Sequence, residues 1–198
     1  MPPRSSRHRR LAALLFAGGV FASASLAGPP VPSADVELGY DIEAAYLYKL
    51  TRYVEWPEGV FASPGDPFVI AVVARGAADE RIVRQALLGK RTSGGRAISV
   101  VLVAPGAALP AHCEIAFVLR SAHLGSAGLR RLVDDRPLLL VGETDGFAER
   151  GGEVNFIFVD DNVRLQVNPD RAERVGLRLR SLLASAAQLV HDKPGVLP

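Results

Sequence analysis

Cysteine is almost absent from this sequence of 198 residues. The single cysteine, Cys113, excludes a disulfide bond within the chain. It leaves an intermolecular bridge or a redox switch as functional interpretations. Free cysteines are among the most often buried residues, so we expect Cys113 to be a small apolar residue packed beside the strand predicted at residues 115–119.

A large excess of positive or negative charge is also missing. Four of the 23 lysines and arginines lie in the first ten residues, which contain no acid, and the remaining 19 are set against 21 acidic residues. Beyond residue 10 the net charge is therefore −2. Nothing basic remains in excess to neutralise a phosphate backbone, so nucleic acid is not expected as a partner.

Long apolar runs are missing from the N-terminal region as well. The run at residues 11–21 is shorter than the roughly 20 residues that a membrane-spanning helix needs. It follows four arginines and precedes the small residues of Ala22-Ser23-Ala24 and Ser25-Leu26-Ala27. This pattern predicts a signal peptide at residues 1–27, cleaved after Ala27, with an uncleaved membrane anchor as the alternative. The mature chain, residues 28–198, is expected to form a single domain.

Common cofactor and catalytic motifs are absent too. The sequence contains neither the G-x-G-x-x-G of a dinucleotide site nor the G-x-x-x-x-G-K-[ST] of a phosphate loop. Gly125 and Gly128 are in the wrong register for G-x-S-x-G, and the histidines and Cys113 lack the spacing of zinc ligands. We therefore expect no cofactor and no metal, and an enzyme is left without a candidate site rather than excluded.

What the sequence does contain is an alternation of helical and strand patterns. A helix is predicted at residues 35–55, ending by Trp56, because Pro57 disfavours helical geometry in the residue before it. Continuous apolar runs are typical of strands that are buried on both faces. Four such runs cover residues 67–74, 98–103, 114–119 and 137–142, and helices are expected between them at residues 78–88 and 124–133. The pattern predicts an α/β fold with a mostly parallel sheet flanked by helices on both faces.

The C-terminal part has a different pattern. Two strands at residues 154–159 and 163–167, joined by polar residues, predict a C-terminal β-hairpin. Asn168 followed by Pro169 predicts the start of a long C-terminal helix that continues to residue 190. On that helix a basic stripe is expected, which is either a solvated face or a contact for an acidic partner. The stripe consists of Arg171, Arg174 and Arg178.

Several segments of the chain match a known family. They are residues 44–50 running into Val54-Glu55-Trp56-Pro57, residues 67–72, Phe147-Ala148 with Gly151-Gly152, residues 163–168, residues 176–179 and residues 181–183. In order and spacing, from residue 40 to residue 190, they resemble the YfiR-like family of periplasmic proteins. The Val-Glu-Trp-Pro helix end, the Gly-Gly hairpin and the Asn-capped final helix carry most of this resemblance.

The resemblance implies a small, exported α/β sandwich without catalytic activity. It also implies binding to the periplasmic sensory domain of an inner-membrane diguanylate cyclase, which is held inactive, so that cyclic di-GMP and biofilm formation are lowered. Relatives in this family tend to form dimers, which implies a homodimer here. Those that respond to disulfide state carry pairs of cysteines, and this chain, with Cys113 alone, lacks the pair that control through an intrachain bridge requires.

Six residues are expected to face the partner. They are Trp56 and Glu58 at the end of the first helix, Arg164, Gln166 and Asn168 on the open face of the hairpin, and Arg171 in the basic stripe. For the aromatic residues at this helix end, core packing and an interface role are equally consistent with the sequence. Two other classes of function remain open: a periplasmic small-molecule sensor with its ligand at the carboxyl ends of the strands, and a hydrolytic enzyme with an unrecognised site.

Overall fold

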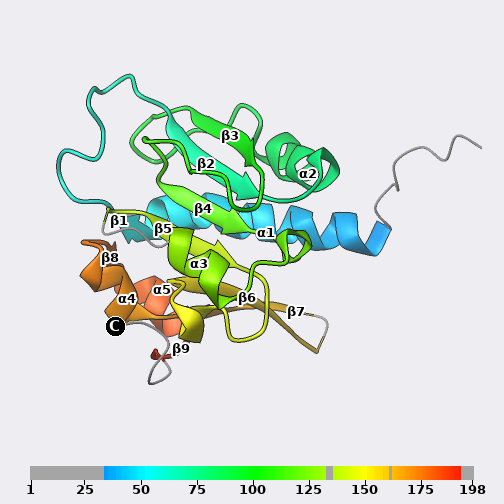
Figure 1. Cartoon of the computed structure of the whole chain (residues 1–198). Helices are drawn as coiled ribbons and strands as arrows, with labels where there is room; N and C mark the ends of the chain where they lie inside the picture. The colour runs from blue at the N-terminus through cyan, green and yellow to red at the C-terminus, as the bar shows by residue number, and fades with distance from the viewer. Residues whose placement is uncertain (1–33, 133–135, 161, 193–198) are drawn as a thin grey trace, which may run out of the picture. The chain divides into compact units, whose positions relative to one another are not determined.

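The computed structural model of the chain describes residues 34–132, 136–160 and 162–192 (Figure 1). The predicted signal peptide at residues 1–27 and the proline-rich linker that follows it lie outside these residues.

Helix α1 (Ala34–Tyr53) carries its buried apolar side chains at a spacing of three and four residues. The helix was expected to reach residue 55, but it ends two residues earlier. Val54–Glu55 instead forms a short strand, β1, that pairs antiparallel with β8 (Arg178–Leu179). The backbone N–H of Arg180 donates to the Tyr53 carbonyl at 2.9 Å. The predicted end was wrong because a segment distant in sequence pairs with the backbone groups that follow the helix.

A seven-stranded sheet forms the centre of the fold. Its strand order is β3-β2-β4-β5-β6-β7-β9. The strands are β2 (Phe68–Val73), β3 (Ile98–Val103), β4 (Ile115–Val118), β5 (Leu139–Gly142), β6 (Val154–Val159), β7 (Asn162–Val167) and β9 (Gln188–Leu189). All pairs from β3 to β6 are parallel, β6 and β7 form an antiparallel hairpin, and β9 is parallel to β7. The predicted α/β class, the mostly parallel sheet and the hairpin are confirmed.

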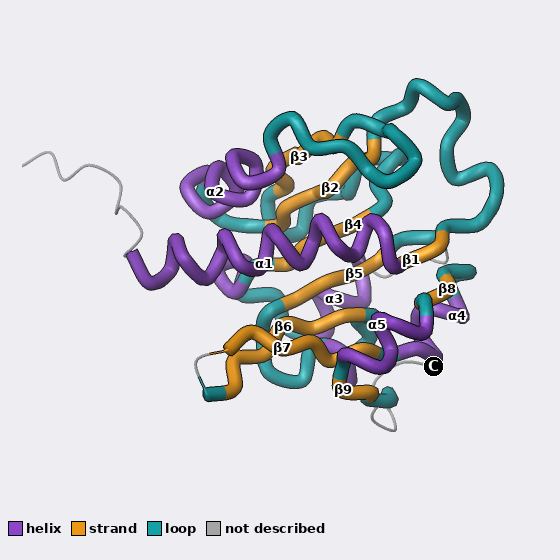
Figure 2. Tube along the Cα trace, turned by 180° about the vertical axis from the view of Figure 1, so that it is seen from behind, coloured by secondary structure: helices purple, strands orange, loops and turns teal. Residues whose placement is uncertain are grey.

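Two buried clusters of side chains lie on opposite faces of this sheet. On β2, Ile70 belongs to the cluster that includes α1 and α2 (Ala77–Leu87), whereas its neighbour Ala71 belongs to the cluster that includes α3 (Ser126–Leu132). Successive side chains of a strand point to opposite faces, which explains this division. Helix α3 lies in front of the sheet in Figure 1, and α1 crosses in front of it when the molecule is seen from behind in Figure 2.

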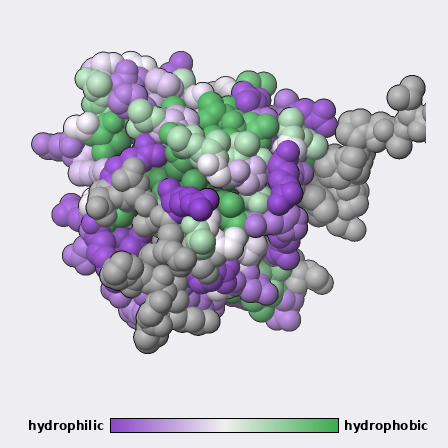
Figure 3. Space-filling model, in the orientation of Figure 1, coloured by the Kyte–Doolittle hydropathy of each residue, from purple (hydrophilic) through white to green (hydrophobic). Residues whose placement is uncertain are grey.

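The α3 side of the sheet is covered unevenly. Leu129 and Leu132 of α3 are buried in the cluster on this side, whereas Val69 of β2 and Val101 of β3 are only partly buried. Figure 3 shows apolar residues gathered at the surface in the upper part of this face, with hydrophilic residues around them. The sheet therefore has its best-packed part near α3 and a more open part near β2 and β3.

The long C-terminal helix predicted for residues 169–190 starts where expected but does not continue. Helix α4 covers only Pro169–Arg174. Its N-cap is Asn168, as predicted, because the Asn168 side chain accepts the backbone N–H of Arg171 at 3.2 Å. The remaining residues form β8, α5 (Ser181–Ala186) and β9. The prediction of one long helix was therefore wrong.

The interruption has a local cause at Gly176. This glycine has a φ of 77°, in the left-handed region that L-residues avoid. The Leu177 N–H turns back to the Ala172 carbonyl at 2.8 Å, which closes the end of α4 in the manner of a glycine C-cap. Beyond it, Arg178 lies on β8 rather than on a helix, so the predicted basic stripe does not form.

The glycines near the hairpin have a packing role. The ring of Phe147 is fully buried, and a Cβ atom added at Gly142 or at Gly152 would overlap it. Only glycine fits on these two sides of the ring. The Phe-Ala and Gly-Gly parts of the motif are thus joined in space, between the end of β5 and the start of β6.

Candidate partner-binding surface

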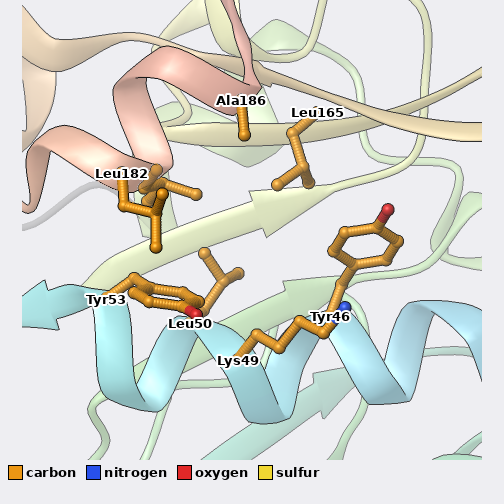
Figure 4. A pocket seen from close by; sticks show the side chains of 8 residues that line it. Tyr46, Lys49, Leu50, Tyr53, Leu165, Leu182 and Ala186 are labelled. Carbon is orange, nitrogen blue, oxygen red and sulfur yellow. The ribbon is translucent and has the colours of Figure 1, made fainter.

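A groove lies between α1 and the segment formed by β7 and α5, and we call it the α1–α5 groove. Its volume is about 260 Å³ and its lining is mainly apolar. The lining residues are Tyr46, Lys49, Leu50, Tyr53, Leu165, Leu182, Leu183 and Ala186. Figure 4 shows Leu182 of α5 and Tyr53 of α1 facing each other across it.

One wall of the groove is a face of α1. Positions 46, 49, 50 and 53 are three or four residues apart, so their side chains lie together on the helix. Leu50 is 1% exposed and contributes the floor. The Tyr46 ring lies 6.0 Å from the Phe156 ring, and Lys49 Nζ lies 4.9 Å from the centre of the Tyr46 ring, within the range of a cation–π contact.

The opposite wall is α5. The break at Gly176 and the pairing of β8 with β1 bring this helix beside α1. Leu183 is buried against the core, whereas Leu182 is 60% exposed at the rim. In one uninterrupted helix these side chains would have continued along the line of α4, so the interruption is what creates the groove.

A second hollow of about 390 Å³ continues from the first. It shares Tyr46, Leu165 and Ala186 with the α1–α5 groove and extends along residues 162–164 of β7. Strand β9 pairs only with the last two residues of β7. The edge of β7 at residues 162–164 therefore has no second neighbouring strand within the part of the chain that the structure describes.

The charged residues of these two hollows are basic. Lys49 and Arg164 line them, and neither lining contains an acidic residue. Both side chains are exposed, and within the described ranges neither has a carboxylate at ion-pair distance. The surface thus combines an apolar floor with two unpaired cations at its margin.

The hairpin residues expected to face a partner lie partly on this surface. On β7, Arg164 and Gln166 alternate with buried neighbours, as predicted. Gln166 accepts a hydrogen bond from Asn155 at 3.1 Å and donates one to Gln188 at 3.4 Å. Of the two, Arg164 is the one that lines the second hollow.

Trp56, three residues beyond the end of α1, is half-buried and packs against the core. Its ring meets Phe68 edge to face, with centroids 5.0 Å apart and an interplanar angle of 89°. The indole N–H is buried and finds no hydrogen-bond partner among the described residues. Glu58 is exposed in the loop that follows. The sequence left core packing and an interface role equally open for Trp56, and in the structure this side chain is half-buried with its ring packed against Phe68.

Asn168 and Arg171 are buried in this structure. Asn168 is 0% exposed and donates to the Ala148 carbonyl at 3.1 Å and to Asp192 Oδ1 at 2.7 Å, while it caps α4. Arg171 is 6% exposed, with its Nε 3.8 Å from Glu153 Oε1. Both side chains therefore contact their own chain here, and neither lies on the exposed surface.

Glu153, the residue that Arg171 approaches, is buried, and its side chain links the start of β6 to β5. Its carboxylate accepts the Leu140 N–H at 2.6 Å. Burial raises the pKa of Glu153 to about 8, although the Leu140 N–H and the Arg171 charge both act to lower it. Glu114, just before β4, accepts the Val69 N–H at 2.6 Å in the same manner, and burial raises its pKa too. These carboxyls satisfy backbone donors beside the sheet.

A further ionisable cluster lies under another face of α1, and the sequence reasoning missed it. Glu43 is 1% exposed and Tyr40 is 8% exposed. The Tyr40 hydroxyl donates to Glu143 Oε1 at 3.5 Å, and the same oxygen accepts the backbone N–H of Arg120. Arg120 Nη2 donates to the Glu143 carbonyl at 2.9 Å. This cluster connects α1 to the loops after β4 and β5.

Burial favours the neutral forms of Glu43, Glu143 and Tyr40. It raises the pKa of Glu43 to about 9, with the Glu143 charge adding to the shift and Arg120 opposing it. Burial also raises the pKa of Glu143, against the lowering effect of the Arg120 N–H and guanidinium, and Asp79 raises it further. Burial and the neighbouring carboxylates raise the pKa of Tyr40. The Glu43–Glu143 pair therefore carries at most one negative charge near pH 7.

The position of this cluster bears on the small-molecule hypothesis. Glu143 directly follows β5, Arg120 follows β4, and Asp79 lies in α2, which follows β2. The cluster thus lies at the carboxyl ends of parallel strands, where a ligand of an open α/β sheet would bind. Here Tyr40 and Glu43 of α1 occupy that place. The sequence signal was Glu43 itself, a carboxylate four residues before the buried Leu47 on the same helix face.

Cys113 is 4% exposed, and its thiol donates to the Ile115 carbonyl at 3.1 Å. Burial raises its pKa to about 11, which disfavours the reactive thiolate. The expectation of a packed residue beside the strand is confirmed.

None of the helices that the described residues form combines the length and the apolar character needed to cross a membrane. In the same residues, no three His, Cys, Asp or Glu side chains are arranged to hold a metal ion. None of the curated proteins compared with the sequence matches it. The model of one protein family, described as YfiR/HmsC-like, matches residues 40–188. This match covers most of the chain, including the groove and the buried clusters, and the protein therefore belongs to the YfiR/HmsC-like family.

Proposed function

We propose that this protein is a periplasmic, non-enzymatic repressor that binds the periplasmic sensory domain of an inner-membrane diguanylate cyclase and holds it inactive. The observation that carries the proposal is the family match over residues 40–188. Binding in this way lowers cyclic di-GMP output and biofilm formation. We also propose that the protein is exported by cleavage of residues 1–27 and acts as a homodimer.

The geometry supports binding rather than chemistry. The carboxyl groups with the largest upward pKa shifts, Glu43 and Glu153, are 1% and 2% exposed. A catalytic acid or base must come within hydrogen-bond reach of a substrate, and these carboxyls are enclosed by their own chain. The accessible surface that stands out is instead the apolar α1–α5 groove with its basic margin.

Among the residues first expected to face the partner, Arg164, Gln166 and Glu58 remain accessible to it. Trp56 is half-buried against Phe68, and Asn168 and Arg171 are enclosed. We therefore propose that partner contact is made through the exposed hairpin residues and through α1. Asn168 and Arg171 act on binding only by holding the end of the hairpin in place.

A genetic and a biochemical experiment test the proposal together. Deleting the gene should raise cyclic di-GMP and matrix production, and restoring the wild-type gene should reverse both. The tagged mature protein should retain a membrane-bound diguanylate cyclase from solubilised membranes, identified by mass spectrometry. Unchanged cyclic di-GMP in the deletion strain, with no cyclase retained, would contradict the proposed function.

A further inference from the structure

We propose that the α1–α5 groove receives an acidic, amphipathic helix of the cyclase's periplasmic domain, which inserts one bulky apolar side chain between Tyr53 and Leu182. This inference rests on the proposed function and adds to it the surface and the chemistry of the occupant.

The size of the groove favours a single anchoring side chain. The groove itself, at about 260 Å³, is below the ~300–1,000 Å³ of typical small-molecule sites, and the hollow that continues from it is more open and more polar. Leu50, Leu165 and Leu183 form an enclosed apolar floor, at 1%, 6% and 4% exposure. Well-packed pockets that take one large apolar side chain from a partner are the usual centres of binding energy at protein interfaces.

The apolar surface continues beyond the groove along α1. Ile42 precedes Tyr46 by one helical turn and is 38% exposed. Phe158, 50% exposed at the hairpin end, lies against Gly39, where an added Cβ would be 3.9 Å from its Cζ atom. From residue 42 to residue 53 the helix rises roughly 17 Å, about three turns of a second helix laid beside it. An amphipathic helix docks on such a surface with apolar residues at helical spacing.

The basic residues at the margin of the groove indicate which residues the partner helix carries beside its apolar face. Lys49 and Arg164 line the two hollows without an acidic neighbour in either lining, and neither is paired in the residues that the structure describes. Complementary charge steers association and fixes the orientation of a partner. The fitting occupant therefore carries aspartate or glutamate on both sides of its apolar face.

Two pairs of matched variants test the surface. Leu182→Glu in the groove is compared with Leu88→Glu, just after the end of α2 and outside both hollows, since both leucines are exposed, at 60% and 70%. Arg164→Glu is compared with Arg81→Glu, an exposed arginine of α2. Tagged mature proteins, checked for folding by circular dichroism, are used to retain the cyclase from solubilised membranes. The groove variants should retain it about ten-fold less than wild type, and the controls should retain it normally.

A carbodiimide, which joins an amine to a carboxylate, tests the chemistry of the occupant. In the purified complex Lys49 should be joined to an aspartate or glutamate of the cyclase's periplasmic domain. Lys90, an exposed residue of the loop after α2, lies over Tyr48 on the other side of α1 and is the internal control. It should not be joined to the cyclase.

The outcomes separate this inference from the function on which it rests. Retention of the cyclase by wild type and equally by the groove variants would reject the groove and leave the repressor function standing. Linkage of Lys49 to a second copy of this chain would make the groove a self-association surface and reject the proposed occupant. Failure of wild type to retain any cyclase, with unchanged cyclic di-GMP on deletion, would reject the function and this inference together.

Discussion

The two faces of helix α1 differ in whether their ionisable side chains are buried or exposed to solvent. On the inner face Glu43 lies at 1% exposure beside Leu47 at 0%, and burial keeps its carboxyl protonated up to a pH of about 9. On the groove face Lys49 stays in solvent and lies over the Tyr46 ring. The inner face therefore connects the helix to the sheet, and the groove face is the one that we propose for recognition. Depth of burial, rather than polarity, separates the structural residues of this helix from those that we propose for recognition.

The largest effect on stability should come from the inner face. Leu47→Ala removes a side chain that is fully buried and leaves a cavity under α1. We expect the free energy of unfolding to fall by about 2–5 kcal/mol. Urea unfolding followed by circular dichroism measures it, with Lys49→Ala on the exposed face as the control. Equal losses in the two variants would show that the faces are wrongly assigned.

The pH dependence of stability should show the effect of burying Glu43 on the inner face. The folded pKa of Glu43, about 9, exceeds its ordinary value of 4.5. Between these pH values the folded state holds a proton that the unfolded state has lost, so the free energy of unfolding falls as pH rises. Below pH 4.5 this contribution to stability is fully present.

Glu43→Gln should flatten that profile because its amide stays neutral at all pH values. Near pH 8 we expect the variant to be more stable than wild type by roughly 1–3 kcal/mol, with little difference near pH 4. A smaller slope should persist, since Glu153 also has a raised pKa. Unfolding by urea at a series of pH values tests this, and identical slopes in both proteins would disprove the assignment to Glu43.

The opposite wall of the groove depends on one glycine. Gly176→Ala places a Cβ on a residue with a φ of 77° and should lower the free energy of unfolding by about 1–2 kcal/mol. Gly65→Ala is the control, because Gly65 has open space around it and no positive φ. If both variants melt at the same temperature, α4 does not end at Gly176 in the way described.

The smallest effect on stability should come from the groove face. Lys49→Glu changes an exposed side chain with no ion pair in the described residues, so the free energy of unfolding should change by no more than about 0.5 kcal/mol. Its effect should instead be seen in weaker retention of the cyclase. A large loss of stability in this variant would mean that Lys49 belongs to the structural face.

Much of the fold could be predicted from the sequence because the signals were local. Apolar runs without alternation, such as the one that became β2, occur where both faces of a strand are buried. The period-2 pattern of β7 and the Asn-Pro start of α4 are equally local, and both were correct. The match of residues 40–188 to the YfiR/HmsC-like family agrees with the resemblance seen in the motifs.

The candidate site could be predicted only in part. Arg164 was identified from strand alternation and does line the second hollow. Asn168 and Arg171 were placed on the surface because a sequence pattern shows polarity and not enclosure, and the structure buries both. The sequence gives no sign that Leu182 is exposed, because apolar residues keep a helical spacing across Gly176 although the helix is interrupted there.

The sequence by itself determined the α/β class, the parallel core strands, the hairpin and the capped start of α4, because each depends on residues close together in the chain. Tertiary structure alone decided where the last segments lie. The strands β1 and β8 are two residues long, too short for any pattern, and they pair across more than a hundred residues. That pairing sets α5 beside α1 and forms the groove. In the same way, the pKa values of Glu43 and Glu143 are raised only because the fold buries the two carboxyls together. The surroundings that disfavour their charge come from distant segments, and their own neighbours in sequence do not supply them.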